Sequence, residues 1–328
     1  MRTVIRLTTL PAALVAASAA FSPAHAARPA PSPVTGELHA PGKWTAARMR
    51  QAEANPLDLP ERAARPAKNP PVTKAVVAKG HSKAPLKQIG RLYIQGEDGR
   101  LGTCTGTVVN TAWPGRGRGS GSLLLTAAHC LQEPSQDWKA DSLVFVPDLD
   151  RKSTPHGLWS GYRTLMWSPW IKKGDATFDY AFVVMAARGS GTIQQRLNGQ
   201  SLRFKSEPKS WVRLYGYAVE HYPRDRDYPE KGTVLRVCKG RIQSAWVSFR
   251  RFSSLKCDMS RGASGGPLIT ALKSSGYGRI IGVTSFRKQG EPVLHSAVFD
   301  KWTKDLFFRA RTIKAPVQPP PQDIVRVS

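Results

Sequence analysis

The fold of this 328-residue chain is decided by three short stretches: TAAHC at residues 126–130, DYAF at 179–182 and GASGGP at 262–267. They supply a histidine, an aspartate and a serine, which are His129, Asp179 and Ser264. A serine hydroxyl attacks a carbonyl only if an imidazole takes its proton, and the imidazole needs a carboxylate that fixes its tautomer and stabilises its charged form. We therefore predict Ser264 as a nucleophile, His129 as its general base and Asp179 as the acid that orients the imidazole.

The glycines around Ser264 support this prediction. They let the backbone turn tightly, so that the amides of Gly262 and Ser264 converge on one point and can hold a developing oxyanion. A purely structural glycine turn is the alternative.

The two other residues each lie at the end of a predicted strand. His129 follows an apolar run, and Asp179 begins one that extends over 180–185. A rival orienting acid, Asp175, lies four residues before Asp179, but no apolar strand follows it directly.

The rest of the chain from residue 89 onward predicts an all-β fold. Short β-branched and apolar runs bounded by Gly, Asn or Asp are typical of strands in sandwiches and barrels. The predicted strands are 89–94, 105–110, 123–126, 143–146, 180–185, 211–217, 232–237 and 279–285. A single amphipathic helix is expected near the C-terminus, where Val298, Phe299, Trp302, Leu306 and Phe307 recur at helical spacing. Residues 313–328 are predicted to be an extended tail.

The N-terminal region has two predicted parts. Residues 1–26 have the features of a secretory signal peptide: Arg2 and Arg6, an apolar run, and the small residues Ala24 and Ala26 at the cleavage site. Residues 27–88 are rich in Pro, Ala, Lys and Arg and poor in large apolar residues, which predicts a pro-segment or flexible leader. An ordered N-terminal extension packed on the domain is the alternative. An uncleaved N-terminal anchor is the alternative to the signal peptide.

Four cysteines in an exported chain suggest two disulfides, for which three pairings exist. Pairing neighbours in the sequence would join Cys104 to Cys130 and Cys238 to Cys257. No CxxC pair or histidine cluster at ligand spacing is present, so we expect no metal.

The formal net charge of +26 is extreme. Residues 1–88 hold 13 basic and 4 acidic residues, or +9, which leaves +17 for the remainder. Such a charge attracts nucleic acid, acidic cell-wall polymers or acidic proteins. Lys and Arg that merely solubilise the protein are the alternative, because they are dispersed and no nucleic-acid motif accompanies them.

Several stretches resemble the chymotrypsin family of serine peptidases, and within it the secreted bacterial branch with glutamyl endopeptidases and trypsin-like relatives. They include, beside the three stretches quoted first, CTGTVVN at 104–110, FVP at 145–147, PHGLW at 155–159 and CDM at 257–259, together with Trp138. The resemblance covers residues 89–312 and implies two six-stranded antiparallel β-barrels with the triad between them. It also supports the two disulfides, and it implies that Ser285 bonds the triad aspartate and lines the substrate channel.

Two departures from the family pattern concern activation and specificity. Ala263 stands where many members have the Asp that receives the new N-terminal amine after zymogen cleavage. Arg287 replaces a glycine that usually leaves the S1 pocket open, so it could fill the mouth of the pocket or neutralise Asp258.

The predicted substrate-binding residues are Asp258, Ser285, Phe286 and Arg287. Asp258 lies six residues before Ser264, where trypsin-like enzymes place the carboxylate that binds a Lys or Arg of the substrate. The alternative is that Asp258 bonds its own loop. Thr284 occupies the position at which a glutamyl preference usually brings a histidine.

We therefore expect a secreted, monomeric serine endopeptidase without a cofactor, made as a zymogen, with protein or peptide substrates and a possible preference for Lys or Arg at P1. Basic residues near the end of the leader, among them Lys79, Lys83 and Lys87, would allow self-trimming. The alternative function is an inactive or weakly active protein of this fold that binds acidic polymers.

Overall fold

The computed structural model describes residues 30–42, 44–57, 61–62, 73–189, 191–205, 209–222 and 226–318. The predicted signal peptide lies outside the described residues. None of the helices found in those ranges is long and apolar enough to cross a membrane.

The first half of the domain is a closed barrel. Its six strands are β4 (Ile89–Gly96), β5 (Leu101–Val108), β6 (Leu123–Thr126), β8 (Trp138–Pro147), β9 (Trp159–Trp167) and β10 (Ala181–Met185). All neighbours are antiparallel, and the pairing of β8 with β9 closes the ring. Side chains such as Leu92, Leu124 and Phe182 are fully buried and form its core. β7 (Gln132–Glu133) adds a short strand beside β8.

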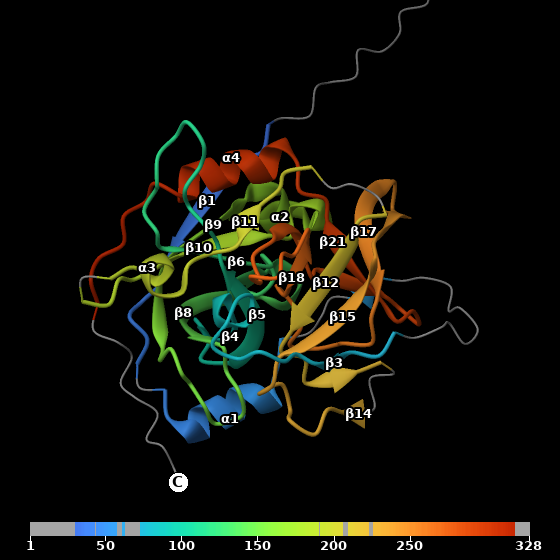
Figure 1. Cartoon of the computed structure of the whole chain (residues 1–328), viewed down its shortest axis with the longest axis horizontal. Coiled ribbons are helices and arrows are strands. Elements are labelled where there is room, and N and C mark those ends of the chain that lie inside the picture. The colour runs from blue at the N-terminus through green and yellow to red at the C-terminus, as the bar shows by residue number, and fades with distance from the viewer. Residues whose placement is uncertain are drawn as a thin grey trace, which may run out of the picture. The chain divides into compact units, whose positions relative to one another are not determined.

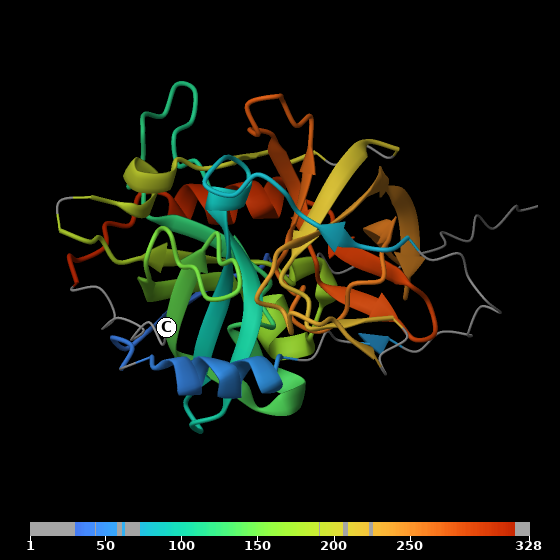
Figure 2. The same ribbon diagram turned by 60° about the horizontal axis from the view of Figure 1, so that its bottom comes forward.

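The second half is built from two further sheets (Figures 1 and 2). One holds β11 (Ser201–Leu202), β19 (Arg279–Val283), β18 (Pro267–Thr270), β12 (Trp211–Gly216), β15 (Arg236–Arg241) and β3 (Val76–Val77) in that order. The other holds β16 (Gln243–Val247), β17 (Arg250–Lys256), β21 (Val293–Ala297), β20 (Phe286–Lys288) and β2 (Glu61–Arg62). A hairpin pairs β13 (Glu220–His221) with β14 (Arg226–Asp227). The predicted all-β, chymotrypsin-like class is confirmed.

Helices are few and short. The predicted C-terminal helix is α4 (Lys301–Ala310), which begins after Asp300 because that carboxylate accepts from the amides of Trp302 and Thr303. Its buried face includes Leu306 and Phe307. The others are α1 (Ala46–Ala54), α2 (Ser168–Lys173), α3 (Ile193–Leu197) and the 3-10 turns η1 (Leu86–Gln88), η2 (Pro134–Gln136) and η3 (Ala176–Phe178).

The described part of the predicted leader is ordered and packed. β1 (Pro33–Glu37) pairs with β9 along all five residues, and α1 packs on β4 and β5. Trp44 is fully buried, and Met49 and Ala52 of α1 are buried too. The expectation of a flexible segment was therefore wrong for these residues, which match the alternative of an ordered extension, because a few large apolar side chains suffice to anchor it.

Both predicted disulfides are present, joining Cys104 to Cys130 and Cys238 to Cys257. The first ties β5 to the residue directly after His129. The second ties β15 to the residue directly before Asp258. Each disulfide therefore fixes the backbone beside a predicted site residue.

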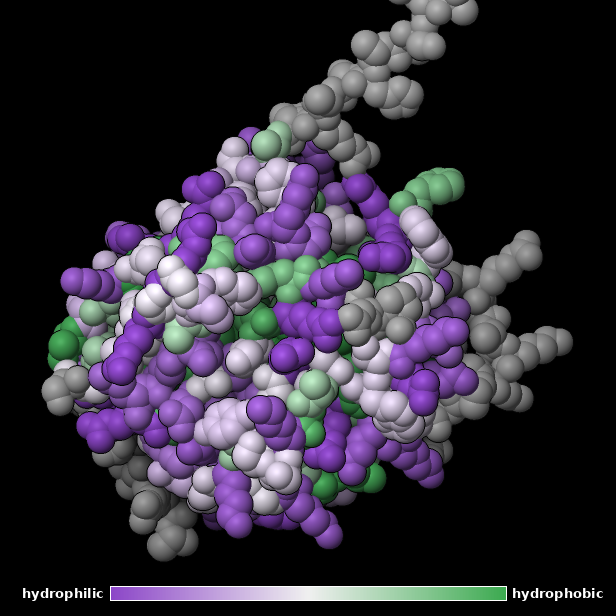
Figure 3. Space-filling view, turned by 45° about the horizontal axis from the view of Figure 1, so that its top comes forward, coloured by the Kyte–Doolittle hydropathy of each residue, from purple (hydrophilic) through white to green (hydrophobic). Residues whose placement is uncertain are grey.

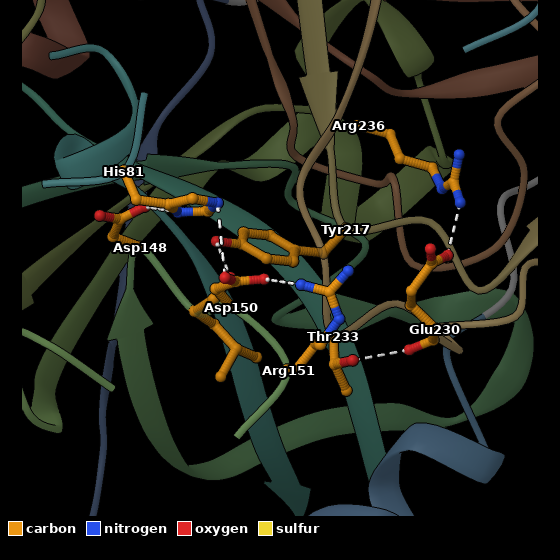
Figure 4. Close-up of polar contacts among 9 residues, drawn as sticks. His81, Asp148, Asp150, Arg151, Tyr217, Glu230, Thr233 and Arg236 are labelled. Carbon is orange, nitrogen blue, oxygen red and sulfur yellow. Dashed lines mark hydrogen bonds and ion pairs between the residues drawn. The ribbon is translucent and has the colours of Figure 1, made fainter. Parts of the chain in front are cut away.

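A polar cluster joins the loop after β8 to three segments: the one between β3 and β4, the one after β12 and the one before β15 (Figure 4). The buried Asp148 carboxylate binds His81 Nδ1 at 2.7 Å, and Tyr217 Oη donates to the carbonyl of Leu149 at 3.1 Å. The amide of Arg151 donates to the carbonyl of Thr233 at 2.8 Å. These contacts hold the two halves of the domain together.

At the C-terminal side, the beginning of the predicted tail lies against the first half. The amide of Ala187 donates to Pro316, and the amide of Gln318 donates back to Ala187. The described tail residues are thus extended, and they are held by backbone hydrogen bonds.

Candidate active site

Strand pairing brings His129 and Asp179 together. β10 pairs with β6 so that Ala181 lies opposite Thr126, which places the residues just before β10 beside those just after β6. Asp179 Oδ2 lies 2.8 Å from His129 Nδ1, and its Oδ1 accepts the backbone amide of His129 at 2.9 Å. Both residues are buried. The carboxylate thus holds the ring and the backbone of His129 at once.

Ser285 adds a third hydrogen bond to this carboxylate. Its hydroxyl donates to Asp179 Oδ2 at 2.6 Å, and its own amide donates to the carbonyl of His295 on β21. Because Ser285 follows β19, the second half of the domain contacts the aspartate of the first half directly.

The turn that carries Ser264 lies against the segment before His129. The amide of Thr105 donates to the carbonyl of Ser264 at 2.8 Å, and Gly265 lies so close to Thr126 and Ala127 that a Cβ there would be 2.9 Å from the Ala127 nitrogen. Gly265 also has a φ of +77°, so glycine is required twice over. This close approach places the turn beside His129.

Two reactive atoms of this site have no hydrogen-bond partner among the described residues. These are His129 Nε2 and Ser264 Oγ, and both are buried. Buried polar atoms are normally hydrogen-bonded, so each of these two unpartnered atoms is a candidate reactive group.

The amides of Gly262 and Ser264 are also available. Neither donates to any group in the part of the chain that the structure describes. Gly262 adopts a φ of +86°, and its carbonyl is turned away to accept the Thr105 hydroxyl at 2.9 Å. The same hydroxyl accepts the amide of Tyr217 at 2.9 Å, which fixes this peptide orientation.

The charge state of His129 depends on its neighbours. Burial alone would lower the pKa of His129, but the Asp179 carboxylate and its hydrogen bond, with a further contribution from Glu133, raise it above its ordinary value. The ring of Trp170 packs 6.4 Å from the imidazole, centroid to centroid. The arrangement therefore favours a proton on the imidazole and stabilises the charged form.

Asp175, the rival acid, does not contact His129. Its Oδ1 accepts the amide and the hydroxyl of Thr177, capping η3, and its Oδ2 pairs with Arg250 at 3.1 Å. It thus shapes the loop before Asp179.

Asp258 is buried and already engaged. Its Oδ1 accepts the backbone amide of Ala75 at 2.7 Å and the hydroxyl of Tyr228 at 3.0 Å. Its own amide donates to the carbonyl of Thr73. The donors come from the N-terminal segment and from Tyr228, so the predicted alternative, a bond to its own loop, does not describe this contact.

Arg287 is fully buried beside Asp258. Its guanidinium donates to the carbonyls of Met259 and Glu291 and lies over the ring of Tyr222. No ion pair joins it to Asp258 among the described residues. Of the two predicted roles for this cation, neutralising Asp258 by a direct pair is not seen.

Phe286, the last predicted substrate-binding residue, uses its ring for packing. The ring stacks on His295 with centroids 4.8 Å apart and meets Phe252 edge-on at 4.9 Å. The side chain of Phe286 is therefore engaged in packing.

Two groupings of cysteine with histidine or aspartate have the compactness of metal sites: Cys104, His129 and Cys130, and Cys238, Cys257 and Asp258. In both, the sulfurs are joined in disulfides, so no thiolate is available as a ligand.

Sequence reasoning missed Thr105 and Trp170 as supports of the site. Thr105 sits in a predicted strand, and nothing in its neighbourhood distinguishes it from other strand threonines. The indole of Trp170 donates to the carbonyl of Gln132 at 2.6 Å, and no sequence pattern predicts this contact.

Comparisons with known proteins give the fold and the family. A protease from Arthrobacter nicotinovorans is similar in structure, with 22% sequence identity and a TM-score of 0.59 over 71% of this chain and 99% of that chain. A thermostable serine protease from an extremophilic microorganism has 23% identity and a TM-score of 0.59, over 70% of this chain and 99% of that chain. A Glu endopeptidase has 15% identity and a TM-score of 0.57, over 73% of this chain and 97% of that chain. At these identities they show the fold alone. No curated protein sequence matches the chain. The trypsin-like peptidase domain, however, matches residues 104–283, more than half of the chain, and the protein therefore belongs to the trypsin-like peptidase family.

Proposed function

We propose that this chain is a secreted serine endopeptidase that cleaves peptide bonds through an acyl-enzyme on Ser264. Membership of the family makes it a serine peptidase by class. The assignment of roles to residues rests on one observation: the turn that carries Ser264 lies against Thr126 and Ala127, directly before the His129 that ends the hydrogen-bonded series Ser285–Asp179–His129.

The geometry gives each residue a step. His129 Nε2 takes the proton of Ser264 as the hydroxyl attacks the substrate carbonyl, and Asp179 stabilises the imidazolium that forms. The amides of Gly262 and Ser264 hold the oxyanion, and a donor of this kind contributes about 2.7–4 kcal/mol to lowering the barrier. His129 then gives its proton to the leaving amine, and water reverses the sequence to release the acyl group.

The test is hydrolysis of casein by the mature protein and by its Ser264→Ala variant. Wild type should cleave casein and be inactivated by a sulfonyl fluoride, and the variant should be inactive. A Ser260→Ala variant in the same turn is the matched control and should retain activity. Undiminished hydrolysis by Ser264→Ala would overturn the proposal.

A preference for Lys or Arg at P1 stays a prediction that depends on Asp258. Its Oδ1 is occupied by Ala75 and Tyr228, so only Oδ2 has no donor among the described residues. A basic P1 side chain would thus bind one oxygen rather than both. Cleavage profiles of wild type and Asp258→Asn on a peptide library measure what remains of the preference.

Secretion is supported by the two disulfides, because disulfides persist in oxidising compartments. Together with the N-terminal features of residues 1–26, they favour export. Recovery of the protein from culture medium, lacking those residues, is the expected result.

One surface observation favours an additional polyanion contact. Three large aromatic side chains are strongly exposed: Trp211, Trp246 and Phe249. Trp211 on β12 lies opposite Arg241 on β15, and Trp246 on β16 lies opposite Arg251 on β17. Phe249 lies in the turn that joins β16 to β17. The face in Figure 3 is largely hydrophilic, with smaller hydrophobic areas between. Such binding should weaken steeply with salt. Affinity for an acidic polymer that is indifferent to salt would remove this second candidate function.

A further inference from the structure

A cavity lies between the loop that joins β8 to β9 and the segment that joins β10 to α3. Its volume is about 620 Å³, within the range of about 300–1,000 Å³ that is typical of small-molecule sites. β10 begins two residues after Asp179, and its five residues span about 16 Å, so Arg188 lies beyond the opposite end of this strand. In Figure 1, α3 also lies on the other side of the domain from β17. The cavity is therefore separate from the candidate active site and from the exposed aromatic residues of the β16–β17 hairpin.

The segments that form this cavity are basic and contain no acid. Its lining residues belong to the segments 151–174 and 180–206, neither of which contains an Asp or a Glu, and two of the lining residues are arginines. The acids that precede the first segment, Asp148 and Asp150, already bond other side chains. A concave site lined by one sign of charge concentrates the potential, so this cavity attracts an anion.

The first arginine, Arg188, is held against one wall of the cavity. Its guanidinium lies over the ring of Trp159, 5.2 Å from the centroid, and Nη1 donates to the carbonyl of His156 at 3.4 Å. The same carbonyl accepts the indole N–H of Trp159 at 3.2 Å. Gly157 makes room for the guanidinium, because a Cβ there would lie 2.7 Å from Nη1. These contacts orient the Arg188 guanidinium before any ligand binds.

The second arginine, Arg196, reaches the cavity from α3. A Cβ at Gly191 would lie 2.8 Å from Arg196 Nε, so the Arg196 side chain passes directly over the backbone of Gly191. The amide and the carbonyl of Gly191 bond the carbonyl and the amide of Arg188, at 3.1 and 3.0 Å. Both arginines are thus tied to one turn, and each of them packs against a glycine that leaves space for its guanidinium.

We propose that this cavity binds a phosphate monoester carried on a small organic body, and that Arg188 and Arg196 recognise the phosphate. A carboxylate has two oxygens in one plane, which a single guanidinium satisfies. A phosphate monoester has three free oxygens in a tetrahedral arrangement, so it accepts from two guanidiniums that come from different segments. Inorganic phosphate alone would leave most of the cavity empty. The organic body would fill the remainder and contact the apolar wall formed by Pro155 and Leu197.

The experiment is calorimetric titration of the full chain with glycerol 3-phosphate at neutral pH and low ionic strength. Wild type should bind with a Kd below about 1 mM. Arg188→Gln and Arg196→Gln should each bind at least tenfold more weakly, because each loses charge-assisted hydrogen bonds to the phosphate. Arg196→Lys keeps the charge but loses the planar fork, so it should bind at least threefold more weakly. The matched control is Lys172→Gln, which removes an exposed charge of α2 and should stay within about twofold of wild type.

Several outcomes would contradict the proposal. Undetectable binding by wild type would remove the site, and equal losses in Lys172→Gln and Arg196→Gln would show an effect of net charge alone. Glycerate that binds as tightly as glycerol 3-phosphate would exclude the preference for phosphate, and inorganic phosphate that binds as tightly would exclude the organic body. Arg196 is exposed, so its variants keep the test valid if Arg188→Gln does not fold. Ser264→Ala should bind like wild type, so this test fails independently of the proposed peptidase function.

Discussion

Replacing Asp179 by Asn should reduce kcat about 10⁴-fold while leaving KM and the fold nearly unchanged. The carboxylate accepts three hydrogen bonds: from His129 Nδ1 at 2.8 Å, from the His129 amide at 2.9 Å and from Ser285 at 2.6 Å. An Asn side chain has one acceptor oxygen and one NH₂ group, so at least one of these donors would face another donor. The imidazolium would also lose its counter-charge.

The expected loss corresponds to about 5 kcal/mol of activation free energy, at 1.36 kcal/mol for each factor of ten. The pH profile should change as well. Because Asp179 raises the pKa of His129, its removal should lower that pKa and shift the acid limb of kcat/KM to lower pH. A merely structural defect would not move the limb in this direction.

The assay is kcat and KM for a fluorogenic peptide over pH 5–9, normalised to intact folded protein by circular dichroism. The matched control is Asp175→Asn, which alters a neighbouring carboxylate that bonds Thr177 and Arg250 and does not contact His129. It should remain within about tenfold of wild type. The reasoning would be refuted by an Asp179→Asn enzyme within tenfold of wild type, or by equal losses in both variants.

Four further predictions concern the site and the stability of the fold. Ser285→Ala should lower kcat about 5- to 30-fold, because Asp179 loses a buried hydrogen bond worth about 1–2 kcal/mol; a kinetic effect below twofold would argue against this contact. Trp44→Ala should lower the free energy of unfolding in urea by about 3–5 kcal/mol, since the indole is fully buried. An unchanged urea midpoint would show that the N-terminal extension does not contribute to the stability of the fold. Replacing Cys238 and Cys257 by Ser should cost about 3 kcal/mol in the same assay, and reduction of the wild type, which also breaks Cys104–Cys130, should cost more. Burial, with the nearby positive charges, lowers the pKa of His295 to about 3, so the unfolded chain binds a proton below pH 6.5 that the folded chain does not. The free energy of unfolding should therefore fall on acidification, and between pH 7 and pH 4 it should fall less in His295→Gln than in wild type.

The predictions that succeeded depend on local residue patterns. The strands β6 and β10 are mostly apolar runs, β4 contains several large apolar residues, and the disulfide pairing agrees with neighbours in sequence. The sequence motifs also led to the correct family. These features were predictable because each is encoded within a few residues.

The features that were missed depend on distant partners. In β9, Gly161 and Arg163 interrupt the apolar residues, so it lacks a continuous apolar run, and it is defined by pairing with β1, β8 and β10. The anchoring of the N-terminal extension depends on Trp44 and on a sheet edge that only the folded barrel provides. No local pattern carries that information.

The specificity pocket shows the same limit. Resemblance to the family predicted that Asp258 and Arg287 belong near the substrate, and the Arg287 guanidinium bonds the carbonyl of Met259, the residue after Asp258. It could not indicate that the donor to Asp258 comes from Ala75, 183 residues away in the sequence. A contact over that separation arises from the fold as a whole.

The central claim is that one buried hydroxyl, on Ser264, is chemically activated by His129. The most direct measurement is peptide mass mapping after treatment with a fluorophosphonate at neutral pH. The account predicts a single adduct on Ser264 in wild type, formed at least 10³-fold more slowly in His129→Ala. An adduct on a different residue, or equally fast labelling without the imidazole, would contradict it.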